Sequence, residues 1–580
     1  MSEPSNPAPP PVEAQAEAPA SGTAAPAGDG TISKKAAKKA EAKAKKEAEK
    51  ARRAAEQAAA QAAAAKAAEA EDLARDNYGQ ETHETKFSDD AIEVSLKNLG
   101  EEHVGKKIQL RAWIQNARMQ GAKMAFVELR EEGTWSIQGV VAASPEGTPV
   151  SRLMVKWVGA INPESFVVVE GTIEKPAVPV KSCRVSNYEL HITKCFVHAA
   201  APTVLGMTLA AANRPIANFS DEEPPVEQAV EKLSVAETTG TPAATMLTHL
   251  DNIVMHKRSY VQQAIADIRA EMKELYRSYL RAHGFKEFEP PCLIGAASEG
   301  GANVFRLPYF EKEAFLAQSP QFYKQIEIAG GRKRVYSAGP VFRAENSNTP
   351  RHMTEFTGLD LEMEIKKDYH EVLDVLEGVL LHIFRNISER CPDEIALVRS
   401  VYPCEEFLLP EPGKKVRLTF AEGQKLLREE GPEEFRNVSD DEDMSTPQEK
   451  ALGAIIRKKY NTDFYVLDKY PESARPFYAK EDPINPKVTN AYDLFMRGQE
   501  ICSGGQRIHD PVELEARIRK KGIDPASPGI KEYVDIFRQA GVPAHGGGGI
   551  GLDRVVAWYL NLPSVHLAAF YPRTPKRLLP

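Results

Sequence analysis

A dense run of charges lies between two apolar stretches at residues 339–364, GPVFRAENSNTPRHMTEFTGLDLEME. The apolar flanks predict two strands, and the polar residues 346–350 predict the turn that joins them. Arg343 would leave the first strand with its planar guanidinium available to a phosphate, and His352 or Arg351 could reach a second phosphate across the loop. Surface hairpins also carry charges without any catalytic purpose, so spacing alone leaves both interpretations open.

A second group of charges, NAYDLFMRGQEICSGGQRIHD, occupies residues 490–510. Its carboxylates, Asp493 and Glu500, are of the hard oxygen type that Mg²⁺ takes when it bridges to nucleotide phosphates. The neighbouring Arg497 and Arg507 make a network of salt bridges the simpler alternative.

A glycine-rich run, HGGGGIGLDRVVAWYL at 545–560, enters an apolar helix with Arg554 near its start. Glycines let a ligand approach the backbone closely, and a helix N-terminus beside an arginine favours anions. The run lacks the GxxxxGK[ST] pattern of a P-loop and does not open a βαβ unit, so a dinucleotide-binding fold is disfavoured.

These three groups must be positioned by the elements around them. From about Met246 onward, long helices at 259–283 and 368–389 are mixed with short strands. Upstream, five short strands fit a small Greek-key barrel, the OB-fold, better than a helical domain; they are predicted at 107–114, 125–129, 136–141, 166–173 and 188–197. Residues 201–245 are typical of a hinge or linker.

The N-terminal residues differ in composition from the rest. Residues 1–30 have almost no large apolar side chains and are predicted to be a disordered tail. Residues 31–76 are predicted to form a solvated helix, and within them 32–53 carry ten Lys or Arg against three Glu, a charge of +7. This segment is either a charged linker or a phosphate-binding arm whose affinity would fall steeply with salt.

The bulk composition is that of a globular protein of two to four domains, with 580 residues, 42% hydrophobic and 27% charged. The sequence shows neither a run of roughly 20 apolar residues that could cross a bilayer nor a secretory signal, so we expect a cytoplasmic protein without membrane association. The six cysteines include no CxxC pair. They are predicted to be reduced and structural, with no zinc site.

Three ordered motifs resemble those of class II aminoacyl-tRNA synthetases. FEPP at 288–291 resembles the end of motif 1, FRAE…RHMTEFTGLD resembles motif 2, and GGGIGLDR resembles motif 3. Neither the HIGH nor the KMSKS pattern of class I appears. From about residue 91 to 580 the chain resembles the eukaryotic cytosolic aspartyl-tRNA synthetases, and its basic segment is similar to the tRNA-binding extension of that group.

This resemblance implies an α+β fold: a class II antiparallel sheet flanked by helices at 246–580, after an anticodon-binding OB-fold barrel at 91–200, a hinge at 201–245 and a basic helical extension at 31–76. It implies an aspartate–tRNA ligase that uses ATP and Mg²⁺ to activate L-aspartate and transfers it to tRNA(Asp). The family dimerises through motif 1, so a homodimer is expected. Association with a multisynthetase complex is left open.

The resemblance also implies roles in the ATP site. Arg343 and Arg554 would be the catalytic residues, with Arg343 at the α-phosphate and Arg554 at the outer phosphates. Glu345 would bind the adenine amino group and Phe356 would stack under the adenine ring. His352 would steady the outer phosphates.

Two further sets follow from the same resemblance. Asp493 and Glu500 would coordinate Mg²⁺, with Glu500 also in the ATP site. Lys324 and Arg507 would face the side-chain carboxylate of aspartate and reject asparagine, whose neutral amide would leave desolvated charges unpaired. The full aspartate-binding set implied is Ser298, Glu299, Gln321, Lys324, Asp360, Ser503 and Arg507.

In the barrel, the resemblance assigns anticodon binding to Arg118, Phe126, Gln138 and Glu189. Stacking and base-edge hydrogen bonds are the usual means of reading single-stranded loops. Phe126 could equally be a core residue of its strand.

The chain departs from the family pattern at several positions. His249, Ile253 and His256 stand where Arg, Arg and Asp are expected. In motif 3 Asp553 replaces the more usual Glu; elsewhere Gln499 replaces a Glu, and YPRTPKR at 571–577 replaces FPRDPKR.

Three rival interpretations remain. A synthetase-like paralogue could serve a regulatory or RNA-binding role with weak or no charging, although Arg343, Glu500, Arg507 and Arg554 are retained. An aspartyl transferase could charge tRNA and feed another acceptor. Asparagine specificity is the nearest enzymatic rival, and Lys324 with Arg507 argues against it.

Overall fold

The computed structural model describes residues 50, 52–53, 72–216, 243–297, 303–347 and 349–579. The chain divides into two compact units, one running to Leu129 with Ile137–Ala200 added, the other comprising Arg130–Ser136 and everything from Ala201. The predicted tail, nearly all of the predicted basic helix and residues 217–242 of the predicted hinge lie outside the described residues. In the described part of the chain, no helix is long and apolar enough to cross a membrane.

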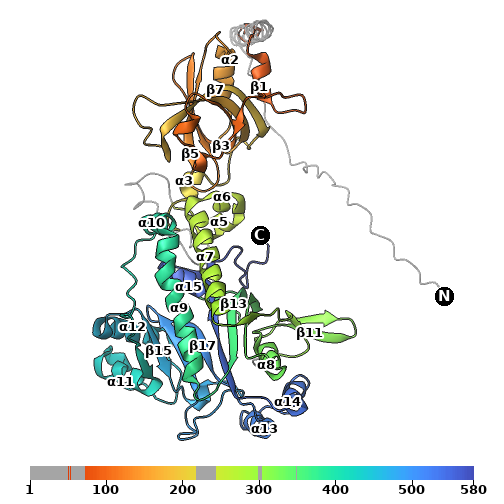
Figure 1. The fold of residues 1–580 in the computed structure, drawn as a ribbon, viewed down its shortest axis with the longest axis vertical. Coiled ribbons are helices and arrows are strands. Elements are labelled where there is room, and N and C mark those ends of the chain that lie inside the picture. Colours follow the sequence, from red (N-terminus) through yellow and green to blue (C-terminus); the bar gives the residue numbers. More distant parts are fainter. Residues whose placement is uncertain are drawn as a thin grey trace, which may run out of the picture. The chain divides into compact units, whose positions relative to one another are not determined.

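The first unit is built on a closed five-stranded barrel (Figure 1). The strands follow in the order β7-β5-β4-β3-β6, and β6 pairs again with β7. The strands follow from the alternation of buried and exposed side chains. On β3, Ile108, Leu110 and Ala112 are buried, while the residues between them are not. All five predicted strands are confirmed, with bounds β3 Lys107–Met119, β4 Met124–Arg130, β5 Ser136–Ala142, β6 Phe166–Glu174 and β7 Val185–Ala199.

Three short elements that the sequence analysis did not predict accompany the barrel. The helix α2 (Arg152–Val158) begins at Ser151, whose hydroxyl accepts a hydrogen bond from the N–H of Met154. Two short strands extend the sheet, β1 (Tyr78–Gln80) alongside β7 and β2 (Ile92–Glu93) alongside β3.

The second unit contains an eight-stranded sheet in the order β14-β15-β16-β17-β18-β13-β12-β8. The six central strands pair antiparallel, and only the two edge strands pair parallel. The predicted class II sheet is therefore confirmed. The strands are β8 Lys286–Glu287, β12 Arg334–Phe342, β13 Glu355–Glu364, β14 Arg417–Thr419, β15 Phe464–Asp468, β16 Ala491–Met496, β17 Gln499–Gln506 and β18 His545–Gly551.

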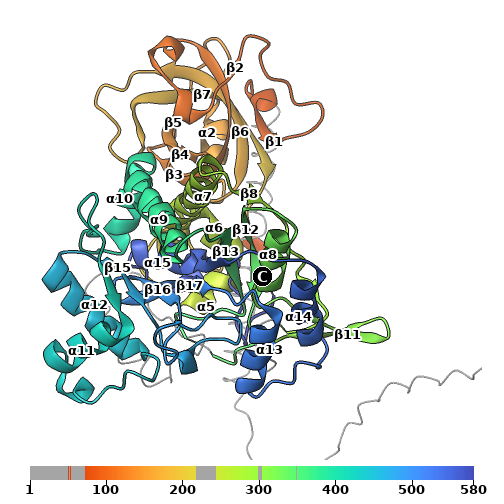
Figure 2. The ribbon, with the colours of Figure 1, turned by 60° about the horizontal axis from the view of Figure 1, so that its bottom comes forward.

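Helices α7 (Tyr260–Ala282), α9 (His370–Arg390) and α10 (Pro392–Val401) pack against one another, and α15 (Leu552–Tyr559) packs on α7 (Figure 2). They share one hydrophobic core with the sheet. On α7 this face is a run of buried apolar residues three or four positions apart, the spacing of an amphipathic helix: Val261, Ile265, Ile268, Met272 and Leu275. The two predicted long helices are thus confirmed to within one or two residues.

The other elements of the second unit surround this core. A small three-stranded sheet contains β9 (Leu293–Ile294), β10 (Arg306–Tyr309) and β11 (Lys312–Leu316). The remaining α-helices among the described residues are α3 Leu209–Ala212, α5 Met246–Asp251, α6 Ile253–Arg258, α8 Gln321–Ala329, α11 Phe420–Glu430, α12 Thr446–Tyr460, α13 Pro511–Lys520 and α14 Ile530–Gln539.

The glycine-rich run forms the central strand β18, between β13 and β17. Glycine is a poor strand former, so the reason for its presence lies in its neighbours. A Cβ on Gly547 would lie 2.1 Å from a carboxylate oxygen of Glu362 on β13. The bare strand therefore leaves room for a buried acidic side chain beside it.

The segment that departs from the family pattern forms α5 and α6. His249 and His256 are both buried, and their Nδ1 atoms lie 3.0 Å apart, so that one ring donates a hydrogen bond to the other. Burial lowers the pKa of His249 to about 4. Burial also lowers the pKa of His256 to about 3, and the nearby His249 and Lys257 contribute to that shift. A neutral pair thus stands where charged side chains were expected.

Candidate active site

A cavity of about 360 Å³ lies in the second unit, bordered by the β12–β13 hairpin, α8, β17 and the start of α15. The three groups of charges identified in the sequence meet here. From the predicted ATP site it is lined by Arg343, Glu345, His352, Phe356, Glu500 and Arg554, and from the predicted aspartate site by Gln321, Lys324, Asp360, Ser503 and Arg507. Ser298 and Glu299 lie outside the described residues.

The hairpin supplies a cation and an aromatic ring side by side. Arg343 follows the end of β12, where its backbone N–H donates to the carbonyl of Thr354 on the returning chain. Its guanidinium carbon lies 5.6 Å from the ring centre of Phe356 on β13. A flat apolar face next to a phosphate-binding group is the combination that a nucleotide requires.

His352 lies in the loop of this hairpin, with Nδ1 2.6 Å from the hydroxyl of Thr349. Burial, helped by the positive charge of Arg554, lowers the pKa of the imidazole. The lowered pKa favours the neutral ring at pH 7. A bound phosphate would favour its protonated form.

Across the cavity, Arg554 at the start of α15 donates from Nη1 to the backbone carbonyl of Glu500 at 3.3 Å and lies 3.9 Å from its carboxylate. Burial and the nearby Asp493 raise the pKa of Glu500, while Arg554 opposes that rise. Two buried carboxylates this close together are the electrostatic setting in which a divalent cation is stabilised.

Asp493 does not line the cavity but lies on β16, opposite Ser503 of β17. Its Oδ2 accepts from Nη2 of Arg475 at 2.6 Å, and Nη1 of the same arginine donates to Ser503 at 2.9 Å. The other carboxylate oxygen, Oδ1, is buried and has no hydrogen-bond partner in the described chain.

Asp493 and Glu500 fit a magnesium site of the kind that is completed by substrate. No group of three or more His, Cys, Asp or Glu among the described residues could hold a metal ion alone. Mg²⁺ commonly takes only one or two carboxylates and fills its remaining positions with water and phosphate oxygens. The unsatisfied Oδ1 of Asp493 is compatible with that role.

The predicted aspartate end is a buried charge network. Lys324 on α8 donates to Asp360 at 2.9 Å and lies 3.5 Å from Glu362. Arg507 donates to both carboxylate oxygens of Glu362, at 3.0 and 3.2 Å. Burial would raise the pKa of Glu362, but Arg507 and Lys324 outweigh it and the pKa is lowered. Two cations and two carboxylates therefore neutralise one another before any ligand arrives.

A chain of hydrogen bonds supports this end from α8. The side-chain amide of Gln321 donates to Gln325 at 2.8 Å, and Gln325 in turn donates to Nε2 of His545 at the same distance. Nδ1 of His545 is 2.8 Å from the carbonyl of Pro543, which fixes the proton on Nδ1. Burial lowers the pKa of His545, consistent with this neutral tautomer.

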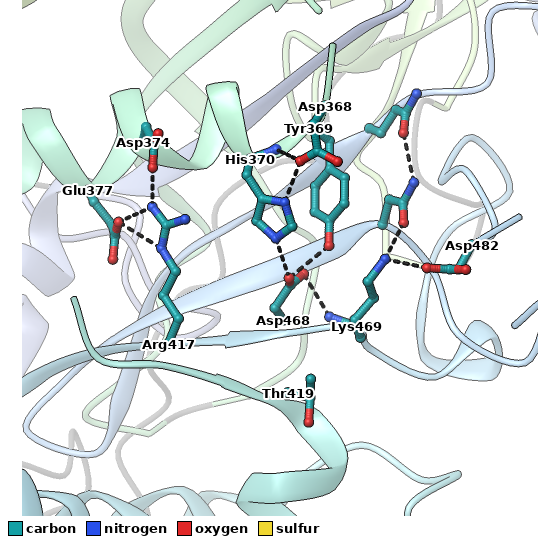
Figure 3. A network of polar contacts seen from close by, with 12 residues as sticks. Asp368, Tyr369, His370, Asp374, Glu377, Arg417, Thr419, Asp468, Lys469 and Asp482 are labelled. Atoms are coloured by element: carbon teal, nitrogen blue, oxygen red, sulfur yellow. Dashed lines mark hydrogen bonds and ion pairs between the residues drawn. The ribbon is translucent and has the colours of Figure 1, made fainter. Parts of the chain in front are cut away.

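A polar network links α9 and β15 to the end of β17 (Figure 3). The hydroxyl of Tyr369 donates to Asp468 at 2.7 Å. Lys469 donates to Asn490 at 2.7 Å, and Asn490 donates to Gln506, the last residue of β17, at 2.8 Å. The network holds the strand end that immediately precedes an aspartate-site arginine.

Asp553 replaces the more usual Glu of motif 3, and both of its carboxylate oxygens accept hydrogen bonds. One carboxylate oxygen accepts from Arg269 at 2.7 Å and the other from the backbone N–H of Thr357 at 2.9 Å. Arg269 also donates to the hydroxyl of Thr357 at 2.8 Å. The shorter side chain thus joins the start of α15 to α7 and β13, next to Arg554.

Sequence reasoning missed several residues that hold this site, among them Glu362, Arg475, Gln325 and His545. Glu362 had a usable signal, because it follows Asp360 by two positions on the same predicted strand and so must share its face. Arg475 had none, since it lies in a segment without motif or periodicity.

The predicted anticodon residues lie in the first unit, one on each of four neighbouring barrel strands: Arg118, Phe126, Gln138 and Glu189. Gln138 donates to Glu189 at 3.0 Å, and the guanidinium of Arg118 lies 5.3 Å from the ring centre of Phe126. Phe126 is half-buried while the residues on either side of it are buried. It therefore points away from the barrel core, which excludes the core alternative.

The sheet is mainly antiparallel, and one cavity lies between its arginine-bearing hairpin, its glycine strand and an arginine-bearing helix. This arrangement defines the catalytic domain of a class II aminoacyl-tRNA synthetase. The family model described as tRNA synthetases class II (D, K and N) matches residues 245–575, and the chain belongs to this family.

Along most of its length the chain is similar to proteins named for aspartate. It is 42% identical over 512 residues to the cytoplasmic aspartate–tRNA ligase of Homo sapiens, covering 88% of this chain and 96% of that protein. The structure of the aspartyl-tRNA synthetase from Entamoeba histolytica matches with a TM-score of 0.74 at 35% identity, over 87% of this chain and 96% of that one. An asparaginyl-tRNA synthetase from Pyrococcus horikoshii, solved with asparaginyl-adenylate, matches with a TM-score of 0.67 at 29% identity, over 84% of this chain and 99% of that one.

Proposed function

We propose that this chain is an aspartate–tRNA ligase of the cytoplasm, which activates L-aspartate with ATP and transfers the aspartyl group to the 3′ end of tRNA(Asp). The observation that carries the proposal is a single cavity in which a nucleotide-type site, Arg343 with Phe356, adjoins a buried pocket containing Lys324 and Arg507. A protein that is 42% identical over 512 residues bears the name of this activity.

In the activation step, an oxygen of the aspartate α-carboxylate attacks the α-phosphorus of ATP and the bond to pyrophosphate breaks. Arg343 stabilises the charge that develops on the α-phosphate, and His352 with Arg554 binds the outer phosphates. Phe356 stacks on the adenine and Glu345 accepts from its amino group. The residues act mainly by positioning and charge stabilisation.

The metal ion belongs to the same step. Asp493 and Glu500 would hold Mg²⁺, which would supply positive charge to stabilise the phosphate oxygens of the nucleotide. Arg475 pairs with Asp493 and compensates the charge of the buried carboxylate.

Selection of aspartate over asparagine rests on Lys324 and Arg507, with Gln321, Asp360 and Ser503 around them. Ser298 and Glu299 complete the proposed aspartate-binding set. Nε and Nη2 of Arg507 donate hydrogen bonds to Glu362, so Nη1 remains to donate to the substrate carboxylate. Glu362 also fixes the guanidinium so that it cannot rotate to accommodate an amide. Asparagine would lose the charge-assisted hydrogen bond, which should weaken its binding relative to aspartate by several kcal/mol.

In the transfer step, a hydroxyl of the terminal ribose of tRNA attacks the carbonyl carbon of the adenylate and AMP leaves. Arg118, Phe126, Gln138 and Glu189 form the outer barrel surface that reads the anticodon by stacking and base-edge hydrogen bonds. The basic segment at 31–76 adds phosphate contacts. The protein works as a homodimer through motif 1, with multisynthetase association as a further proposal that co-purification of native complexes would test.

The test is ATP–pyrophosphate exchange with aspartate and with asparagine, followed by charging of purified tRNA. Exchange with aspartate alone, and charging of tRNA(Asp), is the expected result. Exchange with asparagine alone would replace the proposal by asparaginyl specificity, the alternative that the match to an asparaginyl enzyme favours. Exchange with neither amino acid would support a non-charging paralogue, and exchange without charging would point to another acceptor.

A further inference from the structure

The helix α12 (Thr446–Tyr460) holds the loop of the β12–β13 hairpin at the cavity wall. Arg351, in that loop, donates from Nη1 to the hydroxyl of Thr446 and from Nη2 to Glu449 at 3.1 Å. The side chains of Arg351 and Glu449 are only 15% and 12% exposed, so this is a largely desolvated ion pair. Arg351 lines the cavity and directly precedes His352.

The same helix also packs against the turn that precedes Glu500, a residue of the cavity lining. A Cβ on Gly453 of α12 would lie 2.3 Å from the Cα of Gly498, in the turn between β16 and β17. Gly498 itself has φ +68, so both glycines are required for this contact. The turn leads directly to Glu500. One helix therefore sets the hairpin loop and the proposed metal-binding strand relative to each other.

The charge of Glu449 depends on these surroundings. Burial raises its pKa to about 7, Arg351 on the hairpin loop and Arg554 on α15 oppose the rise, and Glu500 on β17 adds to it. Arg351 is thus the principal group that opposes this rise and favours the ionised carboxyl. In return, Glu449 is the only carboxylate paired with Arg351 among the described residues, and Nε of Arg351 is buried without a partner there.

We propose that Glu449 is a positioning residue for the activation step: through Arg351 it fixes the hairpin loop, and with it His352, beside the outer phosphates of ATP. The inference rests on the proposed function, because the phosphates are those of the ATP that this cavity is proposed to bind. Glu449 lies in a helix outside the three sequence motifs and outside the cavity lining.

The test is aspartate-dependent ATP–pyrophosphate exchange by the full chain carrying Glu449→Gln, which keeps the size of the side chain and removes its charge. Loss of one charge-assisted, largely buried bond should raise the KM for ATP and for pyrophosphate about tenfold. The KM for aspartate should stay unchanged, because Lys324 and Arg507 form their ion pairs with Asp360 and Glu362 of β13 and not with residues of α12. A merely structural role would lower the amount of active protein and leave the ratio of the KM values unaltered.

The matched control is Glu430→Gln on α11. It breaks an exposed ion pair, 2.7 Å long, between Glu430 and Lys459 of α12. It should behave as the wild type. Arg351→Met should reproduce the effect of Glu449→Gln, and the double variant should be no weaker than Arg351→Met alone if Glu449 acts through Arg351.

An unchanged KM for ATP in Glu449→Gln, or single effects that multiply in the double variant, would overturn the proposal. If Glu449→Gln does not fold, Arg351→Met decides alone, and an unchanged KM for ATP in that variant overturns the proposal too. Wild-type exchange is measured in the same series, so that failure of the proposed function and failure of the inference are told apart.

Discussion

The two ends of the cavity arrange their charges differently. At the aspartate end, Arg507 is buried and forms two hydrogen bonds with the equally buried Glu362. At the phosphate end, the side chain of Arg554 is 25% exposed and lies 3.9 Å from the carboxylate of Glu500, which is 34% exposed. The first pair is complete without a ligand, whereas the second is loose enough to change partners.

This difference follows from desolvation. An unpaired charge cannot be buried without a large penalty, so a deep specificity pocket must bring its own counter-charges. A partly solvated site can leave its charges incompletely paired at little cost, since water screens them. The end that selects the amino acid is therefore organised during folding, and the end that binds ATP is completed by the charges of its ligands.

The largest expected effect is on stability at the aspartate end. Glu362→Ala would leave Arg507 and Lys324 buried without their shared partner, which should lower the free energy of unfolding by about 4 kcal/mol. Urea unfolding followed by circular dichroism measures this. Glu313→Ala, which removes an exposed partner of Arg306, is the control and should change little. Equal stability of the two variants would contradict the view that the pocket is organised by its charges.

The next effect is on catalysis at the phosphate end. Arg343→Ala should lower kcat/KM for ATP–pyrophosphate exchange at least about a hundredfold, because one preorganised donor to the developing charge is lost. Its stability should remain near that of the wild type. A variant that lost stability like Glu362→Ala but kept its exchange rate would show that the two ends do not differ in the stated way.

A pH test concerns the scaffold shared by both ends. The pKa of His256 is about 3 in the folded protein and about 6.5 when unfolded, so the unfolded chain binds more protons below pH 6.5. The stability from keeping this ring neutral is full above about pH 6.5 and is lost as the pH falls toward 3. Between pH 7 and pH 5 the loss should be about 2 kcal/mol for each histidine of the pair.

The measurement is urea unfolding at both pH values, for the wild type and for the double variant His249→Leu with His256→Leu. The double variant should lose most of this pH dependence. An equally steep dependence in both proteins would place the titrating groups elsewhere, with the carboxylates of the phosphate end as the next candidates.

The smallest expected effect is on the affinity for tRNA, with no change in the reaction at either end of the cavity. Deleting residues 1–71 removes all but the last five residues of the predicted basic segment at 31–76 and leaves Asp72, whose Oδ1 accepts a hydrogen bond from the N–H of Ala74. The affinity for tRNA should fall about fivefold at moderate salt, and less at high salt, because the lost contacts are to phosphates. Exchange should not change. Unchanged tRNA affinity would show that the segment is a linker.

The elements that sequence patterns predicted are those whose signal is local. The barrel strands and the hairpin follow from alternation over a few residues, and α7 follows from its apolar spacing. The short helix α2 was missed because seven residues give too little periodicity to recognise. The glycines of β18 were noticed, but their place in a central strand is imposed by β13 and β17 and not by their own preference.

For the site, the motif residues were found because their types and spacing are contiguous. The residues that hold them were not. Glu449 and Arg351 are 98 positions apart, and Gln325 and His545 are 220 apart. No pattern within either segment points to the other.

The sequence by itself determined the family, the order of the predicted domains and the kinds of charge that each motif brings. Only the tertiary structure decided which charges neutralise one another and which are left for ligands. Arg507 and Glu362 lie 145 positions apart, yet pair because β17 and β13 both flank the glycine strand. The physical reason is that ion pairing depends on distance and burial, and both are set by the register of the sheet and the helices that cover it.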